Sequence, residues 1–389
     1  MIEYVHHNSD GNVRRIDMEN IIIPNSLQIT MDDVGWFNGE DDRKRGGSAR
    51  TAMTRRHCVE DYAAINELGK RLNMRINCAF ILGEWDPDNR LRRVKHLSKY
   101  GDAWNNAAYL CKEEMQAVVD NVNDSPYIDI AVHGLLHNYY NPQIPYSNSD
   151  YYYNIDGVTY MSPEDEIRAR FDAFFDILDY YKINKTVNSF IPPSFKYIWG
   201  SMAHILADYG IKYVSTLFEP MAVPSGFTQP VSVGIEGEGI ITLDRNNNII
   251  PWYEISTNTD TLPVTEGIFG CHWPNILHVE KTRHSKIIDN WVSYFERCSD
   301  TYGIILSRDI AFAATQSLFR EYTSVAYENG RMTADISRVP MTEGRGEKFY
   351  ISSRSEIKSY SGCEIKIYEH KNGFINYEVT PISNIMKFE

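Results

Sequence analysis

The sequence predicts an α/β protein built on parallel strands, with a small β region at its C-terminal end. Three observations lead to this expectation. From residue 27 to about residue 325, short apolar runs alternate with segments whose apolar residues recur at helical spacing. Residues 227–265 interrupt this rhythm with a glycine-rich, polar stretch that we interpret as an inserted hairpin or a long loop. The tail from about Arg331 alternates polar and apolar residues instead. Strand–helix alternation on this scale is typical of a parallel α/β barrel or an open sheet.

The predicted elements follow in chain order. The strands are expected at residues 29–31, 75–82, 128–132, 186–191, 211–216 and 268–271. The helices are expected at residues 61–72, 110–122, 162–181, 199–209, 281–297 and 309–327. The third helix has the clearest start, because Pro163 follows Ser162 and three acidic residues fill the first turn.

The predicted organisation is one large domain over residues 1–325 and a small β appendage over residues 331–389. In the tail, residues 364–370 and 374–379 alternate polar and apolar side chains. The Asn-Gly pair at 372–373 separates them, and this arrangement is a strong hairpin signal.

Composition excludes some classes of partner. The 389 residues carry a formal net charge of −13, which argues against nucleic acid, because phosphate contacts need a basic face. No stretch is long and apolar enough to span a bilayer, and no signal peptide is visible at the N-terminus. The six cysteines form no C-x-x-C pair, so we expect reduced thiols and a cytoplasmic location. The oligomeric state stays open.

Acidic residues and histidines follow two of the predicted strands. Asp32 and Asp33 come directly after one apolar run, and His133 and His137 come at the end of another. A spacing of four puts both imidazoles on one face of a helical turn, where they can bind a single cation. The ends of the two strands would bring these side chains to one rim. The sequence therefore predicts a divalent metal with an open coordination position, as a catalytic metal requires.

Aromatic residues lie next to these groups in the sequence. Such planes beside polar groups suit the mixed faces of sugars, although a folded cover is the simpler alternative. The segment after His137 contains Tyr139, Tyr140, Tyr146, Tyr151, Tyr152, Tyr153 and Tyr160. The predicted substrate-binding residues are Trp36, Pro193, Tyr139, Tyr140 and Trp273.

Four segments together resemble the polysaccharide deacetylases of the NodB-homology, carbohydrate esterase family 4-like group. Thr-Met-Asp-Asp at 30–33 resembles the first motif of that family, and His-Gly-Leu-Leu-His at 133–137 resembles its H-x-x-x-H metal motif. Phe-Ile-Pro-Pro at 190–193 resembles the third motif, and residues 268–272 resemble the late strand that ends in a histidine. The resemblance covers roughly residues 20 to 325. It implies a distorted (β/α) barrel of the NodB type.

The resemblance also implies roles for the metal-site residues. Asp33, His133 and His137 would hold the divalent cation, with Zn²⁺ as the expected ion. Such a metal polarises the acetyl carbonyl and lowers the pKa of its bound water from about 9 toward about 7. Asp32 would then be the general base that accepts a proton from that water. Two adjacent carboxylates can divide the work, because the cation neutralises one of them.

Two further roles follow from the same resemblance. His272 would be the general acid that protonates the departing amine. The oxyanion would lie between the metal and a backbone N–H, for which Ser194 and Phe195 are the candidates. Taken alone, His272 could equally pack or form a hydrogen bond at a strand end.

The third motif departs from the family pattern. The family supplies an arginine there that orients the general base, whereas this chain has Phe190 and Ile191. A basic residue from elsewhere would have to replace it, and Arg43, Lys44 and Arg45 on the loop after the aspartates are candidates. These three residues are otherwise a solvated charged loop.

The expected function is metal-dependent removal of an acetyl group from an N- or O-acetylated sugar or polysaccharide precursor. Two alternatives stay open. One is an amidohydrolase that cleaves a small C–N substrate on the same scaffold. The other is an inactive carbohydrate-binding or assembly protein, which the missing motif arginine favours. Taken singly, the aspartates could also be a helix cap or turn, and the histidines a surface pair.

Overall fold

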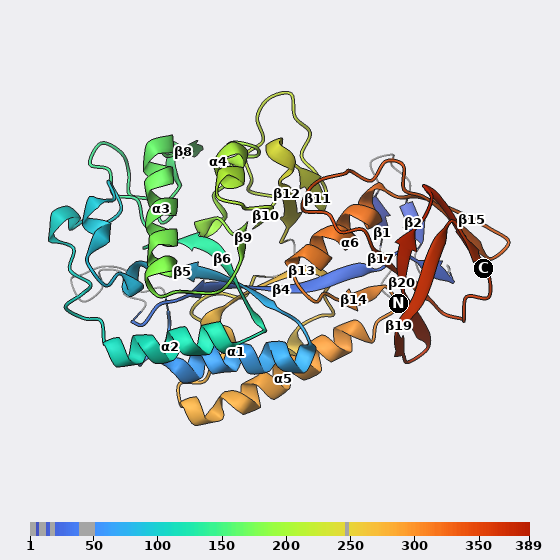
Figure 1. Ribbon diagram of the computed structural model, residues 1–389, viewed down its shortest axis with the longest axis horizontal. Coiled ribbons are helices and arrows are strands. Elements are labelled where there is room, and N and C mark those ends of the chain that lie inside the picture. Colours follow the sequence, from blue (N-terminus) through green and yellow to red (C-terminus); the bar gives the residue numbers. More distant parts are fainter. Residues whose placement is uncertain (1–4, 8–12, 16–19, 39–50, 246–248) are drawn as a thin grey trace.

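The computed structural model describes residues 5–7, 13–15, 20–38, 51–245 and 249–389. A curled, nine-stranded sheet forms its centre, with helices on both sides (Figure 1). The helices are α1 (Val59–Leu72), α2 (Lys112–Asp124), α3 (Glu164–Tyr180), α4 (Ala203–Asp208), α5 (His284–Ser299) and α6 (Ile310–Tyr322). The strands of the sheet are β4 (Asn25–Val34), β5 (Ile76–Ile81), β6 (Ile128–Gly134), β9 (Val187–Phe190), β10 (Tyr213–Thr216), β11 (Val233–Ile235), β12 (Ile241–Asp244), β13 (Gly267–His272) and β14 (Ile304–Leu306).

The strand order confirms the predicted α/β class. The sheet runs β11-β12-β10-β9-β6-β5-β4-β13, and β14 also pairs with β4. Every pair is parallel except β11 with β12. Among the described residues, no strand pairing joins β12 to β13. The sheet is therefore curled rather than closed into a barrel. The carboxyl ends of the parallel strands meet at one edge, which carries the predicted site.

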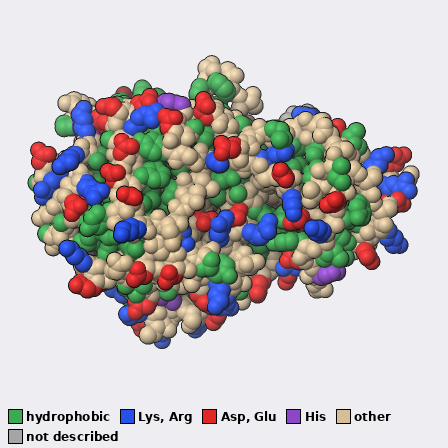
Figure 2. Space-filling model, viewed as in Figure 1, with side chains coloured by type: hydrophobic (Ala, Val, Ile, Leu, Met, Phe, Trp, Pro, Cys, Tyr) green, Lys and Arg blue, Asp and Glu red, His purple; other side chains and the backbone are tan. Residues whose placement is uncertain are grey.

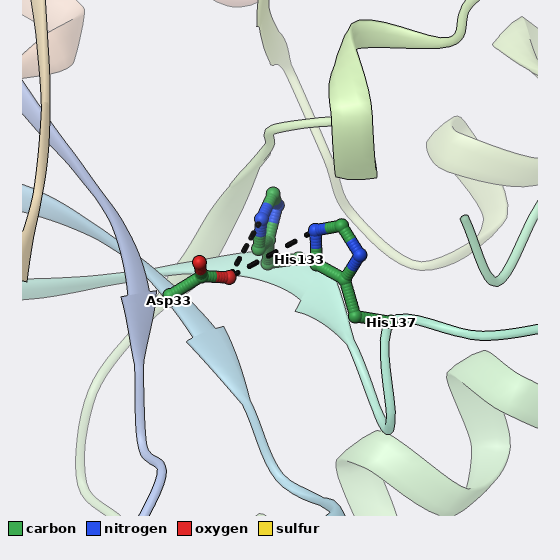
Figure 3. Close-up of side chains that lie close together, drawn as sticks. All are labelled: Asp33, His133 and His137. Carbon is green, nitrogen blue, oxygen red and sulfur yellow. Dashed lines mark ion pairs between the residues drawn. The ribbon is translucent and has the colours of Figure 1, made fainter. Parts of the chain in front are cut away.

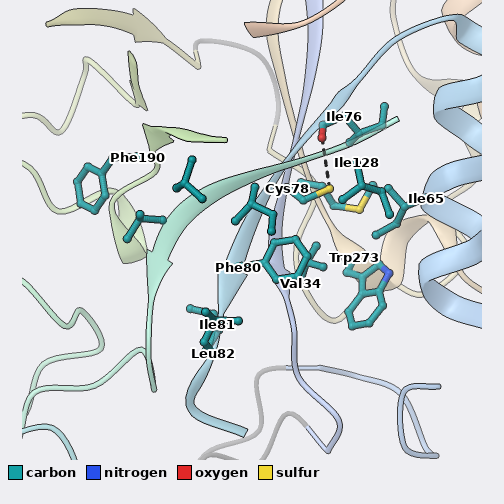
Figure 4. Close-up of a cluster of buried hydrophobic side chains, with 14 of the residues drawn as sticks. Val34, Ile65, Ile76, Cys78, Phe80, Ile81, Leu82, Ile128, Phe190 and Trp273 are labelled. Atoms are coloured by element: carbon teal, nitrogen blue, oxygen red, sulfur yellow. Dashed lines mark hydrogen bonds between the residues drawn. The ribbon is translucent and has the colours of Figure 1, made fainter. Parts of the chain in front are cut away.

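The central strands are buried on both faces. Almost every residue of β4, β5 and β6 is covered, as is typical of parallel strands between two layers of helices. Helices α1 to α5 cover the outer face of the curl, with α1, α2 and α5 drawn below the sheet and α3 and α4 above it, while α6 packs on the inner face (Figure 1). Figure 4 shows Ile65 of α1, Phe80 of β5 and Trp273 packed beside Val34. Each fully buried side chain of this size contributes about 2 kcal/mol.

The hairpin expected within residues 227–265 is confirmed as β11 and β12, which pair antiparallel, and β12 also joins the main sheet beside β10. Gly234 of β11 is required for packing, because a Cβ on this residue would lie 2.4 Å from the ring of Trp199. One prediction of local structure needs correction. The last predicted helix ends at Tyr322, because the following residues form a strand.

The C-terminal region is made of two four-stranded sheets. The predicted hairpin around the Asn-Gly turn is confirmed as β19 and β20, which pair antiparallel. One sheet contains β15 (Ser324–Glu328), β16 (Arg331–Asp335), β21 (Ile385–Phe388) and β18 (Tyr360–Ser361). The other contains β19 (Cys363–Lys371), β20 (Phe374–Pro381), β17 (Phe349–Ser353) and β3 (Ile21–Ile22). This region shares a buried core with α6, and the division at residue 325 stays a prediction.

Two small hairpins complete the described structure. They pair β1 (Val5–His7) with β2 (Val13–Arg15), and β7 (Tyr152–Ile155) with β8 (Val158–Met161). Of the helices in the described ranges, none combines the length and apolar composition needed to cross a bilayer. All six cysteines are unpaired, in agreement with the expected thiols, and the cytoplasmic location stays a prediction.

Candidate metal centre

Three buried side chains from β4 and from the end of β6 converge at the carboxyl edge of the sheet (Figure 3). Asp33 Oδ1 lies 3.6 Å from His133 Nε2 and 3.8 Å from His137 Nε2. Ligand bonds of about 2.0–2.1 Å to a tetrahedral ion place neighbouring donor atoms about 3.4 Å apart. The three donors therefore stand close to the separation that a bound cation imposes. In the described ranges this is the only group of three such side chains whose donor atoms all lie within 4.8 Å.

Two of the three candidate ligands have an unusual backbone conformation. Asp33 has φ 63° and His137 has φ 57°, both in the left-handed region that disfavours residues with a Cβ. Each such residue costs about 1–3 kcal/mol, which the surrounding fold must offset. This backbone turns the two side chains toward the end of β6, where His133 is located.

The orientation of His133 is fixed by the chain itself. Its Nδ1 donates a hydrogen bond to the carbonyl of Ile191 at 2.6 Å, which leaves Nε2 facing Asp33. Metal-binding histidines are commonly held in this way by their second ring nitrogen. Ile191 belongs to the segment where the family pattern has arginine, and here its backbone oxygen orients a candidate ligand.

Asp150 supports the turn that joins the two histidines. Its Oδ1 accepts hydrogen bonds from the backbone N–H groups of Leu135 and Leu136, at 3.2 and 3.3 Å. A Cβ at position 134 would lie 2.5 Å from Asp150 Oδ2, and Gly134 has φ 149°. Glycine is therefore required for this carboxylate to reach the turn.

The electrostatics of the centre favour a cation. Burial by itself would raise the pKa of the Asp33 carboxyl, but His133, His137 and His272 together hold that pKa well below its usual range. Burial would lower the pKa of His133, yet the neighbouring carboxylates Asp33 and Asp32 raise it. Asp33 Oδ1 is buried and accepts no hydrogen bond. Because buried polar atoms are normally satisfied, this oxygen fits the role of a metal ligand.

Asp32 lies beside the candidate ligands and is paired with an arginine. Its Oδ2 accepts a hydrogen bond from Arg245 Nη1 at 2.9 Å, and both side chains are at most 2% exposed. The other oxygen, Oδ1, is buried and has no hydrogen-bond partner. Asp32 therefore has one oxygen held in place and one free for proton transfer.

Arg245 is the basic residue that pairs with Asp32, although it lies outside the third motif. It follows β12, its backbone N–H donates to Thr216, and its guanidinium lies 5.4 Å from the ring centre of Phe195. A Cβ on Gly270 of β13 would lie 2.8 Å from Arg245 Nη2, so glycine makes room for the guanidinium. We did not predict this residue from the sequence, although the apolar run directly before it could have marked a strand end. The earlier candidates Arg43, Lys44 and Arg45 lie outside the described residues.

The buried pair predicts a specific pattern of stability. Arg245→Met leaves the Asp32 carboxylate buried without its partner, which should lower the free energy of unfolding by about 3–5 kcal/mol. The double variant Asp32→Asn, Arg245→Met has no unpaired charge, so its free energy of unfolding should fall much less than that of Arg245→Met. Urea unfolding of the two single variants and the double variant tests this cycle. Strictly additive losses would contradict it.

His272 ends β13, and its backbone lies opposite Asp32 in the strand register. Its Nδ1 donates to the carbonyl of Ile250 at 2.7 Å, which leaves Nε2 as the nitrogen available for proton transfer. His272 is among the charges that lower the pKa of Asp33, so it lies near the centre. This placement is compatible with the predicted role as general acid.

Most of the predicted substrate-binding aromatics are covered by protein. Trp36 and Trp273 are fully buried, and Trp273 stacks on His57 at 3.9 Å. Tyr139 is also buried, and its hydroxyl donates to Glu166 at 2.9 Å. These rings follow the site residues in the sequence but point into the core, a difference that residue type does not reveal.

The remaining predicted binding residues differ in their access. Pro193 is buried, whereas Tyr140 is half-buried and packs 5.0 Å from Tyr146. The backbone N–H of Phe195 already donates to the Pro192 carbonyl at 3.2 Å, so it is not available to an oxyanion. Ser194 stays the candidate for that role.

Glu236 links the loop after the Pro-Pro turn to the hairpin that precedes Arg245 through hydrogen bonds. Its carboxylate accepts hydrogen bonds from Thr242, from the hydroxyl of Tyr197 and from the backbone of Gly200. Burial raises the pKa of Glu236 from 4.5 to about 6 despite these donors.

This shift predicts a pH-dependent contribution to stability. Because the folded state binds the proton more tightly, the contribution of Glu236 is fully present below about pH 4.5 and is lost as the pH rises through about 6. The loss amounts to about 2 kcal/mol. Glu236→Gln should remove it, so the stability difference between wild type and variant should change by that amount from pH 4.5 to 7.5. Urea unfolding checks this, with exposed Glu238→Gln as the control. A difference independent of pH would refute it.

Comparisons with known proteins give limited likeness. No protein-family model matches the chain, and no curated protein matches it. Among solved structures, a Mycobacterium smegmatis protein described as a polysaccharide deacetylase aligns at TM-score 0.34 and 13% identity, covering 73% of this chain and 76% of that one. The 4-alpha-glucanotransferase of Thermococcus litoralis aligns at TM-score 0.38 and 12% identity, covering 75% of this chain and 39% of that one. A GH57-type branching enzyme of Pyrococcus horikoshii aligns at TM-score 0.33 and 11% identity, covering 57% of this chain and 46% of that one. The chain thus spans less than half the length of the last two, and none of these likenesses assigns it to a family.

Proposed function

We propose that this protein is a metal-dependent hydrolase that removes an acetyl group from an N- or O-acetylated sugar. One observation carries the proposal: two histidines and one aspartate converge at a strand edge, beside a second aspartate with a free oxygen. Three protein ligands leave a coordination position open, which distinguishes a catalytic site from a structural one. Two imidazoles with one carboxylate are a donor set found at catalytic zinc sites, so Zn²⁺ is the ion that we expect.

The residues divide the reaction among them. When bound, the cation would polarise the acetyl carbonyl and acidify a coordinated water. Asp32 Oδ1 accepts a proton from the attacking water as the new bond to the acyl carbon forms. Arg245 keeps the other oxygen of Asp32 in place. His272 Nε2 donates a proton to the leaving nitrogen or oxygen as the old bond to the acyl carbon breaks, and Ile250 holds its ring. A positioned acid or base of this kind contributes about 10²–10⁴-fold to the rate.

A sugar is the substrate class that the surroundings favour. Tyr140, Tyr146 and Tyr160 keep accessible ring surface in the region after His137, and Tyr146 is 49% exposed. Aromatic faces beside polar groups suit sugar rings. The inactive alternative is weakened, because it depended on a missing arginine and Asp32 pairs with Arg245.

Acetate release tests the proposal. The protein loaded with Zn²⁺ should liberate acetate from at least one member of a panel of N- and O-acetylated sugars. Removal of the metal with a chelator should abolish release, and added Zn²⁺ should restore it. Release from small amides such as acetamide, with none from the sugars, would favour the amidohydrolase alternative. No release from either class by the metal-loaded protein would refute the proposed function.

A further inference from the structure

A positively charged hollow lies on the loop between β5 and α2. It has a volume of about 300 Å³ and is lined by Asp88, Asn89, Arg90, Arg92 and Arg93. At the end of the molecule where Figure 1 draws this loop, Figure 2 shows Lys and Arg side chains interspersed with Asp and Glu. Such a concentration of arginine is unexpected in a chain whose formal net charge is −13.

The charge of the hollow is not cancelled by its own carboxylate. Asp88 lies 3.4 Å from Arg90, which also packs over the ring of Tyr180 at 5.2 Å. Arg92 and Arg93 are both exposed, and Nε of Arg92 donates to the carbonyl of Trp104. One arginine therefore neutralises the carboxylate, and two guanidinium groups remain facing solvent at the hollow.

The loop that carries the hollow is joined to the metal centre at its start. The backbone N–H groups of Leu82 and Gly83 donate to the carbonyls of Gly134 and Leu135, at 3.2 and 2.6 Å. These two carbonyls belong to the turn between the candidate metal ligands His133 and His137. The first residues of the loop are thus paired with the metal-binding turn.

Farther along the same loop, residues 95–96 are hydrogen-bonded to the segment after the metal-binding turn and to α3. The backbone N–H of Tyr140 donates to the carbonyl of His96 at 2.7 Å, and the His96 ring bonds Glu166 at 2.9 Å. Glu166 also accepts from Tyr139, and Arg170 donates to the carbonyl of Lys95 at 2.9 Å. The residues that flank the lining segment on both sides, 82–83 and 95–96, are therefore hydrogen-bonded to elements next to the metal-binding turn.

We infer that the hollow binds a phosphate group carried by the substrate. This inference rests on the proposed function and narrows it: the substrate is an acetylated sugar that bears a phosphate or diphosphate. Paired guanidinium groups suit phosphate, because their planar donors match its oxygens and keep their charge at all relevant pH values. Binding energy from a phosphate held away from the reacting bond also positions the acetyl group for hydrolysis.

Kinetics with matched substrates provide the first test. N-acetylglucosamine 1-phosphate should be deacetylated with a kcat/KM at least about 10-fold higher than N-acetylglucosamine, since its phosphate adds charge-assisted contacts to the arginines. The double variant Arg92→Ala, Arg93→Ala should lose this preference and keep its rate with the uncharged sugar. The control Lys358→Ala, Lys366→Ala removes two exposed charges from the C-terminal region and should keep the preference. A larger gain with uridine diphosphate N-acetylglucosamine would identify a diphosphate as the group bound.

Binding separates this inference from the proposed function. Inorganic pyrophosphate should bind the metal-free protein in calorimetry at low salt, and at least about 10-fold more weakly to the Arg92, Arg93 variant. Arginine-dependent binding of pyrophosphate without any acetate release would support phosphate binding at the hollow and refute the proposed hydrolase activity. Acetate release at equal rates from charged and uncharged sugars, in the wild type and in the Arg92, Arg93 variant, would refute phosphate binding at the hollow. The proposed hydrolase activity would not be affected by that result.

Discussion

Replacing Asp32 with asparagine is expected to lower the turnover number by about 10²–10⁴-fold, the usual contribution of a general base. Asparagine has the same shape but cannot accept a proton from water at neutral pH. Asp32 is not among the three candidate metal ligands, so the variant should keep its metal. Acetate release measured beside elemental analysis separates the two effects.

Asp129→Asn is the matched control for this experiment. Asp129 also lies on a central strand, β6, but near its amino end, away from the carboxyl edge that carries the site. Its replacement should leave the turnover number unchanged. Full activity in Asp32→Asn would show that Asp32 is not the base. Loss of metal in that variant would show instead that Asp32 is itself a ligand.

Replacing Asp33 with alanine is expected to weaken metal binding by more than about 100-fold, and to abolish turnover with it. Loss of an outer partner of a ligand already costs 10–100-fold in affinity, and Asp33 is a proposed ligand itself. The variant also removes the only negative charge of the triad, so two imidazoles alone would face the cation. Competition with a metal-binding dye measures the affinity. The exposed His204→Ala variant should bind like the wild type, and equal binding by Asp33→Ala would contradict the assignment.

The core of the site could be predicted from the sequence because it depends on short-range patterns. Asp33 and His133 each follow an apolar run, and such runs become parallel strands whose ends meet. The spacing of His133 and His137 then indicates a shared ion. The structure brings the three side chains together as expected, although the observed backbone at His137 is a left-handed turn rather than a helix.

Other features could not be predicted because they depend on long-range packing. Arg245 reaches Asp32 across 213 positions of the chain, and only the curl of the sheet makes them neighbours. Trp36 and Tyr139 have the same residue types whether they face a sugar or the core. Likewise, the pairing of Ile22 with Ser352 joins segments that show no local sign of contact.

The proposed function depends on one cation bound by Asp33, His133 and His137. Anomalous diffraction from crystals of the Zn²⁺-loaded protein, recorded on both sides of the zinc absorption edge, locates this cation. We predict one strong peak about 2.0–2.2 Å from Nε2 of each histidine and from a carboxylate oxygen of Asp33, the distances typical of zinc. An active, metal-loaded crystal with no peak among these three side chains would show that the metal binds elsewhere and that the proposed site is wrong.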